Sequence, residues 1–281
     1  MYCYYDGMIM KESDVSISPM SHGFLYGVGF FETFRTYNGE VFQLDAHFER
    51  LTRALTDLNM ACSLTPEQLR IACRQLNELD ENKDGYFRLN VYAGEEGLGL
   101  AVPQYDHVHV LLLRKELHVS RGTEKLAYRI EVPRNSEETT YRHKSFNFLN
   151  NVKARQQLNS LATEEGILIN REGYVVEGVT SNVFWSKDHV IYTPSVATGL
   201  LEGTARSTVL KIASPHYEVC IGEFKEEDLH SIEEMWITNA VQELVPIKSY
   251  ENKRLLGNKG PIYQHLHALY QQVVYKGENE K

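Results

Sequence analysis

Residues 166–194, GILINREGYVVEGVTSNVFWSKDHVIYTP, constrain the fold more than any other stretch, because apolar runs of strand length alternate there with turn residues. The turn signals are Arg171-Glu172-Gly173 and Lys187-Asp188. Strands joined by such short turns form successive hairpins. The second half of the chain is therefore predicted to contain a sheet folded on itself.

Helices are expected to cover this sheet. A strand at 126–135 precedes a helix at 147–162, and a glycine-bounded turn leads into another helix within 198–213. The last predicted helix lies near 262–275. Its expected buried face consists of Leu266, Leu269, Val273 and Val274.

The first 115 residues predict a separate α+β unit. The sequence YNGE at 37–40 is a hairpin signal, and strands are expected at 86–94 and 107–114. One helix spans roughly Asp45–Asn59, with Phe48, Leu51, Leu55 and Leu58 on one face. The next opens at Thr65-Pro66-Glu67, an N-cap followed by proline, and its apolar stripe is Leu69, Ala72, Cys73 and Leu76.

These elements predict a smaller N-terminal domain over residues 1–115, a polar linker at 116–125 and a larger C-terminal domain at 126–281. The chain of 281 residues is long enough for two hydrophobic cores. Its net charge of -9 argues against a nucleic-acid or anionic-membrane partner and favours a small-molecule substrate. Four widely spaced cysteines, the absence of a signal-like start and the shortness of the apolar runs indicate a cytoplasmic enzyme. No metal site is predicted.

Lys144 lies in RHKSFNFLNNVKARQQ, residues 142–157, beside phenylalanines and just before a predicted helix. An amine that leaves water loses hydration, which lowers its pKa and frees it for Schiff-base chemistry. A solvated lysine at a helix start is the ordinary alternative.

Three further stretches contain groups that could bind a cofactor. Glu177 lies in an apolar strand pattern, where its carboxylate needs either a protonated ring nitrogen or an arginine as partner. Gly203 precedes Thr204 and Ala205 at a helix start, where backbone N–H groups can bind a phosphate. Arg50, beside His47 and expected on the helix face opposite Phe48 and Leu55, carries a guanidinium that can bind a phosphate through two hydrogen bonds.

An amine, a carboxylate, a helix N-terminus and an arginine are together what a pyridoxal 5'-phosphate site requires. The chain resembles the fold-type IV, class IV family of pyridoxal-phosphate enzymes along nearly its whole length. That family includes branched-chain aminotransferase, D-amino-acid aminotransferase and 4-amino-4-deoxychorismate lyase. The resemblance rests on DVSISPMSHGFLYGVGFFETFR, HFERL, HKSFNFLNNVKA, EGVTSNVFW, LLEGTAR and ITNAVQELVPI.

The resemblance implies an α+β fold with a smaller N-terminal domain and a pseudobarrel-like C-terminal domain that binds the cofactor. It implies that Lys144 holds the cofactor as a Schiff base, that Glu177 keeps the pyridine nitrogen protonated and that Arg50 contacts the phosphate. The turn Gly203-Thr204-Ala205 resembles the phosphate-binding turn of the family, and Asn239 falls in the second phosphate-contacting segment. Many relatives have threonine where this chain has Ala205, so one hydroxyl contact is missing.

The substrate side separates the family members. Tyr26, Phe31 and Arg35 match the spacing in branched-chain enzymes, whereas D-amino-acid aminotransferases typically carry lysine at the last position. Thr33 is typical of the lyase, and glycine of the branched-chain enzymes. Some lyases have an arginine in the segment that reads YAGEEGLGLAVPQ here, and this chain has none, which leaves Arg88 and Arg35 as candidates for a substrate carboxylate.

The expected activity is therefore that of aminodeoxychorismate lyase, with Lys144 and Thr33 as its catalytic groups and 4-aminobenzoate for folate biosynthesis as its product. The alternatives are a branched-chain or D-amino-acid aminotransferase and, from a different class, a non-catalytic small-molecule binding protein. The resemblance further implies a homodimer.

Overall fold

The computed structural model describes residues 1–100, 104–117 and 123–276, and the chain divides into two units. Unit 1 comprises Met1–His118 together with His143–Asn147, and unit 2 comprises Val119–Arg142 and Phe148–Lys281. The segment with Lys144, which the boundaries predicted from sequence assign to the C-terminal domain, thus groups with unit 1. Part of the expected linker, 118–122, lies outside the described residues.

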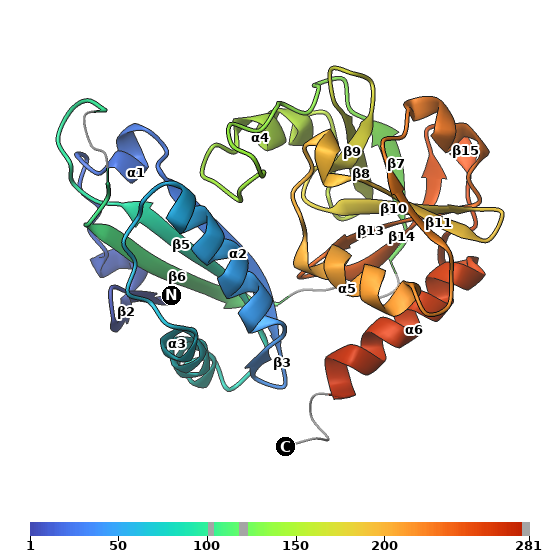
Figure 1. The fold of residues 1–281 in the computed structure, drawn as a ribbon. Helices are drawn as coiled ribbons and strands as arrows, with labels where there is room; N and C mark the ends of the chain where they lie inside the picture. Colours follow the sequence, from blue (N-terminus) through green and yellow to red (C-terminus); the bar gives the residue numbers. More distant parts are fainter. Residues whose placement is uncertain (101–103, 118–122, 277–281) are drawn as a thin grey trace. The chain divides into compact units, whose positions relative to one another are not determined.

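Unit 1 is an antiparallel sheet covered on one face by two helices (Figure 1). The strand order is β2-β1-β6-β5-β3-β4. The strands are β1 (Tyr2–Tyr5), β2 (Met8–Lys11), β3 (Gly29–Tyr37), β4 (Glu40–Val41), β5 (Gly85–Ala93) and β6 (Val108–Glu116). The helices are η1 (Glu12–Asp14), α1 (His22–Leu25), α2 (Leu44–Asp57) and α3 (Pro66–Glu78).

The turn and the helix cap predicted in unit 1 are confirmed. Asn38 and Gly39 have φ angles of 49° and 85°, which form the tight turn between β3 and β4. Thr65 caps α3 through a reciprocal pair of hydrogen bonds with Gln68. The predicted stripe of α3 is buried, but Leu58 is 38% exposed because α2 ends at Asp57.

Unit 2 is built on a nine-stranded mixed sheet in the order β12-β11-β10-β13-β14-β7-β8-β9, with β15 paired to β14. The strand β9 stands last in this order but also lies against β10, so the sheet curls on itself. The strands are β7 (Lys125–Arg129), β8 (Glu164–Ile169), β9 (Val175–Gly178), β10 (Asn182–Lys187), β11 (Val190–Pro194), β12 (Val219–Gly222), β13 (Glu234–Asn239), β14 (Glu243–Tyr250) and β15 (Lys253–Arg254).

Helices α5 and α6 lie side by side against β13 of this sheet (Figure 1). The helices of unit 2 are α4 (Leu149–Arg155), η2 (Val196–Thr198), α5 (Thr204–Ala213), η3 (Glu226–Ser231), η4 (Gly257–Lys259) and α6 (Pro261–Lys276). Among the described residues, no helix combines the length and the apolar character needed to cross a bilayer.

Three predicted features of unit 2 are wrong in detail. The strand expected at 126–135 ends at Arg129, ahead of Pro133, which has no N–H to give. The helix expected to reach residue 162 ends at Arg155, because Asn159 turns the chain by donating its backbone and side-chain N–H to Glu164. On α6, Val273 is 41% exposed, and the buried positions that follow Leu266 are Tyr270 and Val274.

Candidate active site

Lys144 lies at the edge of β3 in unit 1. The backbone N–H of Phe31 donates to the Lys144 carbonyl at 2.8 Å, and that of Phe146 donates to Gly29 at 2.9 Å. A Cβ at Gly29 would stand 2.7 Å from the Phe146 ring, so this close approach requires glycine. On the other side of Lys144, His143 Nε2 pairs with Asp57 at 2.8 Å. The lysine backbone is thus fixed on both sides.

The Lys144 side chain is half-buried rather than enclosed. Its Nζ lies 4.5 Å from the centre of the Phe31 ring, and Arg88 Cζ lies 3.7 Å from the same ring. The phenylalanines expected beside Lys144 were those of its own segment, Phe146 and Phe148, whereas the ring that its amine faces is that of Phe31, which comes from β3. Two cations share one aromatic side chain, which is a surface suited to an anionic, planar ligand.

The substrate-side residues of β3 share one face of the sheet. Phe31, Thr33 and Arg35 alternate with residues that point to the helices, and Thr33 pairs across the strands with Arg88. Thr33 is half-buried, and Arg35 is 5% exposed with its Cζ 4.1 Å from the Tyr37 ring centre. Burial lowers the pKa of Arg88, although an arginine stays charged at neutral pH.

Tyr26 follows α1 and is 37% exposed. Its hydroxyl accepts a hydrogen bond from Gly99 N at 2.7 Å. The segment beyond Gly99 includes residues 101–103, which lie outside the described residues, so the predicted substrate loop is only partly described.

Arg50 is part of a buried ionic cluster that the sequence did not predict. Glu32, on the helix-facing side of β3, accepts hydrogen bonds from Arg50 Nε at 2.7 Å, Arg50 Nη2 at 2.6 Å and His47 Nδ1 at 2.7 Å. The expectation that Arg50 and His47 lie opposite Leu55 is wrong for His47, which is 2% exposed and buried with Leu51 and Leu55. A signal was available, since Glu32 alternates with Phe30 and Phe34 on the apolar side of the strand.

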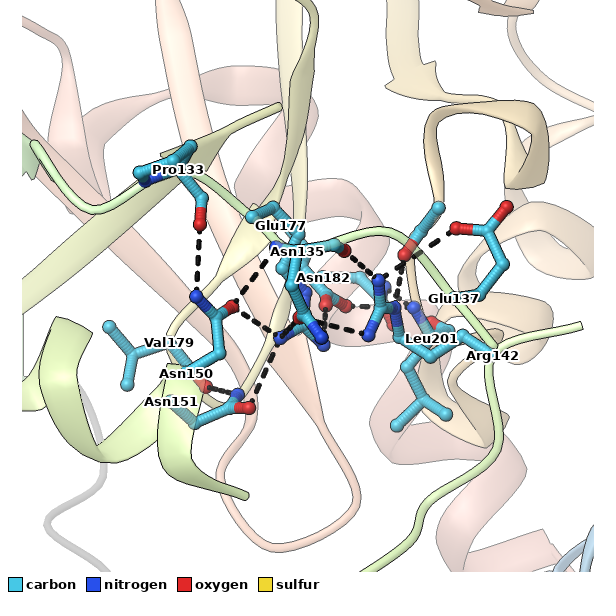
Figure 2. Close-up of polar contacts among 12 residues, drawn as sticks. Pro133, Asn135, Glu137, Arg142, Asn150, Asn151, Glu177, Val179, Asn182 and Leu201 are labelled. Atoms are coloured by element: carbon cyan, nitrogen blue, oxygen red, sulfur yellow. Dashed lines mark hydrogen bonds and ion pairs between the residues drawn. The ribbon is translucent and has the colours of Figure 1, made fainter. Parts of the chain in front are cut away.

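Glu177 lies on β9 of unit 2 and is 4% exposed. Its Oε2 accepts a hydrogen bond from Leu201 N at 2.9 Å (Figure 2). Its Oε1 stands 2.8 Å from Arg134 Nη2. Of the two partners weighed from sequence, the arginine is therefore present. The Glu177 Oε1 contact with Arg134 lacks the angle of a hydrogen bond, and within the described residues this oxygen has no other hydrogen-bond partner.

Asparagine oxygens, not carboxylates, hold the other side of Arg134. Its Nη1 donates to the Oδ1 atoms of Asn135, Asn150 and Asn151 at 3.3, 2.9 and 3.1 Å. A second buried arginine, Arg142, donates to Asn135 and to the Gly199 carbonyl. Arg134 thus lies between the Glu177 carboxylate and a set of neutral amide oxygens.

Gly203 is the N-cap of α5, as predicted, and Thr204 and Ala205 form its first turn. Asn182 holds the preceding loop by donating to the Leu201 carbonyl at 2.8 Å, and a Cβ at Gly203 would clash with its Oδ1. The first N–H groups of a helix have no partner within it, so this turn can bind an anion. Ala205 is buried and adds no hydroxyl.

The Asn239 side chain closes a turn. Its Oδ1 accepts from Val241 N at 3.0 Å and from Gln242 N at 2.7 Å, and its Nδ2 donates to Gln242 Oε1 at 3.2 Å. Two backbone N–H groups of the turn, those of Val241 and Gln242, are thus used within it. The role of Asn239 as a cofactor ligand stays a prediction.

The comparisons with known proteins agree with this geometry. The model of the amino-transferase class IV family matches residues 29–250. The aminodeoxychorismate lyase of Bacillus subtilis strain 168 is 36% identical over 282 residues, which cover 99% of this chain and 96% of that protein. A branched-chain-amino-acid aminotransferase of Pseudomonas aeruginosa is 30% identical over 96% of this chain and 92% of its own.

Among solved structures, the branched-chain aminotransferase of Thermoproteus uzoniensis with norvaline superposes with a TM-score of 0.90 at 27% identity, covering 99% of this chain and 96% of that one. The fold is that of the fold-type IV enzymes, as predicted. The chain belongs to the class IV aminotransferase family. It is a pyridoxal-phosphate enzyme with a small-molecule substrate, which excludes the non-catalytic alternative.

The residues present fit the cofactor. A buried carboxylate oxygen without a hydrogen bond among the described residues, Glu177 Oε1, suits a protonated ring nitrogen. The N-terminus of α5 suits a phosphate, and the half-buried amine of Lys144 suits an aldehyde.

Proposed function

We propose that the enzyme is a 4-amino-4-deoxychorismate lyase, which releases pyruvate from its substrate and yields 4-aminobenzoate for folate biosynthesis. One observation carries the proposal. The Thr33 hydroxyl stands on the face of β3 that also bears Phe31, whose ring lies 4.5 Å from the Lys144 amine, and Thr33 pairs with Arg88. A proton donor, an amine and a guanidinium thus share one face of the sheet. The 36% identity to a lyase supports the same activity.

For the cofactor, we propose that Lys144 binds its aldehyde, Glu177 its ring nitrogen, and Arg50, the Gly203-Thr204-Ala205 turn and the backbone at Asn239 its phosphate. The bound cofactor supplies an electron sink that acidifies the carbon bearing the substrate amine. Arg134 and the Leu201 N–H keep the Glu177 carboxylate oriented. In this role Glu177 accepts a hydrogen bond and does not transfer a proton to the substrate.

Lys144 and Thr33 carry the proton transfers in this proposal. With the substrate bound, the free Lys144 amine would remove the proton from the ring carbon that bears nitrogen. The electron pair released makes the ring aromatic and breaks the carbon–oxygen bond to the enolpyruvyl group. The Thr33 hydroxyl delivers a proton to the methylene carbon of the departing enolpyruvate, which becomes pyruvate, and solvent restores the hydroxyl proton.

Arg88 and Arg35 are the proposed partners of the substrate carboxylates. Both stand on the Thr33 face of the sheet, since Arg35 follows Thr33 by two residues and Arg88 pairs with it. Tyr26 and Phe31 line the same substrate region in this proposal. Guanidinium groups bind carboxylates through two parallel hydrogen bonds, which fixes the orientation of the substrate.

The test is a direct assay of products. Purified enzyme with 4-amino-4-deoxychorismate is expected to release pyruvate and 4-aminobenzoate, and a 2-amino acid with 2-oxoglutarate is expected to give little amino transfer. Thr33→Val should slow the lyase reaction by about 100-fold, in the range of general acid catalysis, while Thr33→Ser should retain it. Neither substitution should change the spectrum of the bound cofactor. Amino transfer without pyruvate release would refute the proposal.

The second candidate is a class IV aminotransferase. The match to the Thermoproteus uzoniensis enzyme and the 30% identity to the Pseudomonas aeruginosa enzyme favour it. In the same pair of assays, an aminotransferase would transfer the amino group to 2-oxoglutarate and would release no pyruvate from 4-amino-4-deoxychorismate. In either case we propose a homodimer, which light scattering of the purified protein tests.

A further inference from the structure

Glu32 is a carboxylate on the apolar side of a strand. It is 1% exposed, and its neighbours on that side of β3, Phe30 and Phe34, belong to the core under α2 and α3. An unpaired charge at such a position is prohibitively costly, so Glu32 is retained only with strong partners.

Its partners are Arg50 and His47, one helical turn apart on α2. Arg50 offers Glu32 the edge formed by Nε and Nη2, with nitrogen–oxygen distances of 2.7 and 2.6 Å. A two-point contact of this kind fixes the plane of a guanidinium, whereas an arginine held at one point keeps much of its rotamer freedom.

The charges in the cluster are also fixed. Burial alone would raise the pKa of Glu32, but the charge of Arg50 and the hydrogen bonds from His47 and Arg50 outweigh it and lower that pKa to about 2. Burial lowers the pKa of His47, against the opposing effect of Glu32, and Arg50 and Lys144 lower it further. At neutral pH the cluster is thus a carboxylate and a guanidinium with a neutral imidazole.

We propose that Glu32 is a positioning residue for cofactor binding: it orients the Arg50 guanidinium toward the cofactor phosphate without touching the cofactor itself. The proposal rests on the phosphate role proposed for Arg50. Two effects of Glu32 oppose each other. Its charge partly offsets the attraction between Arg50 and a phosphate, whereas its two-point contact holds Arg50 in place. Because the contact is buried and short, we assign the larger effect to orientation.

The sign of one substitution separates the two effects. Apo enzyme carrying Glu32→Gln is titrated with pyridoxal 5'-phosphate and, separately, with pyridoxal, which lacks the phosphate. If orientation dominates, affinity for pyridoxal 5'-phosphate falls about tenfold or more, and affinity for pyridoxal stays within about twofold. If charge dominates, Glu32→Gln tightens binding of pyridoxal 5'-phosphate, and the proposal is wrong.

The matched control is Glu40→Gln. Glu40 also binds an arginine through Nε and Nη2, at 3.2 and 2.6 Å from Arg74, but this pair is exposed. The control should bind both ligands as the wild type does.

Two more variants keep the test decisive if Glu32→Gln does not fold. Glu32→Asp retains the charge but shortens the side chain, so it should weaken pyridoxal 5'-phosphate binding and spare pyridoxal. In a background of Arg50→Gln, Glu32→Gln should cause no further loss, since Glu32 acts through Arg50. Equal losses for both ligands, or an undiminished loss in the Arg50→Gln background, would overturn the proposal.

Wild-type behaviour distinguishes this inference from the proposed function. A wild type that binds pyridoxal 5'-phosphate but releases no pyruvate contradicts the lyase and leaves the role of Glu32 to be decided by the titrations.

Discussion

Glu32 in unit 1 and Glu165 in unit 2 are both 1% exposed, yet their surroundings shift the pKa values of the two carboxyl groups in opposite directions. Glu32 forms short hydrogen bonds to a cation, and its pKa falls to about 2. Glu165 stands 3.9 Å from Lys125 Nζ, beyond hydrogen-bond distance, and burial raises its pKa despite the opposing effects of Lys125 and two backbone N–H groups. Both carboxylates have a cation nearby, so what distinguishes them is that the cation beside Glu32 is in direct hydrogen-bonding contact, whereas the cation beside Glu165 is not.

The same comparison separates two lysines. Lys125 is 2% exposed, and burial lowers the pKa of its amine against the opposing effect of Glu165. Lys144 is half-buried beside an aromatic ring. Burial alone would therefore select Lys125 as the reactive amine, whereas the family motif and the neighbouring Phe31 select Lys144. We therefore assign a structural role to the Lys125–Glu165 pair and propose the catalytic role for Lys144.

The largest expected effect is the loss of all turnover in Lys144→Ala. The amine is both the attachment point and the base in the proposed reaction, so the absorption band of the covalently held cofactor should also disappear. Unfolding free energy should change by no more than about 1 kcal/mol, since the side chain is only half-buried. Lys153→Ala, at an exposed position on α4, is the control and should retain both the band and the activity.

Lys125→Met should lower the stability of the fold but leave the absorption band of the bound cofactor in place. Removing one partner of a buried pair leaves the other uncompensated, which costs about 3–5 kcal/mol. Denaturant unfolding at neutral pH measures this loss, and the double variant Lys125→Met/Glu165→Gln should recover part of it. A single variant as stable as the wild type would show that Lys125 contributes nothing to the fold.

The pH dependence of stability should carry opposite contributions from the two carboxylates. The pKa of Glu32 drops from 4.5 to about 2 on folding, so its contribution of about 3 kcal/mol is present above pH 4.5 and is lost as the pH falls toward 2. The pKa of Glu165 is raised on folding. Its contribution to the free energy of unfolding is therefore present at a pH below the ordinary pKa of a glutamate, and it is lost as the pH rises.

Unfolding curves measured between pH 2 and pH 7 test both signs. Glu32→Gln should reduce the loss of stability in acid, and Glu165→Gln should remove part of the loss on raising the pH. The same pH profile for both variants would contradict the distinction between the two sites.

The smallest expected effect is that of Glu40→Gln. Its partner Arg74 lies on the surface, where solvent and salt screen the pair. The thermal midpoint should not move measurably, and a shift as large as that of Glu32→Gln would mean that burial is not what distinguishes the two arginine contacts.

The sequence predicted the elements and the chemical groups better than their partners. Turns at Asn38-Gly39 and the cap at Thr65 depend on a few adjacent residues, so local pattern suffices for them. Glu177 was identified because a carboxylate interrupts an apolar strand. Its partner Arg134 was not, because the two lie on separate segments and only the curled sheet brings them together.

Side-chain environment was the least predictable property. Phe31 was assigned to the substrate, but the sequence gives no measure of how far the Lys144 amine stands from its ring. Glu32 was missed because one acidic residue in a strand also fits a solvated face. The buried cluster arises only when α2 packs on β3 and places Arg50 and His47 on the same carboxylate.

The central claim is that Lys144, and not the more deeply buried Lys125, holds the cofactor. Borohydride reduction of the enzyme loaded with pyridoxal 5'-phosphate attaches the cofactor permanently to the lysine that binds it, and peptide mapping by mass spectrometry then locates it. We predict a single modified peptide that contains Lys144. Modification at Lys125, or at no lysine, would contradict the assignment.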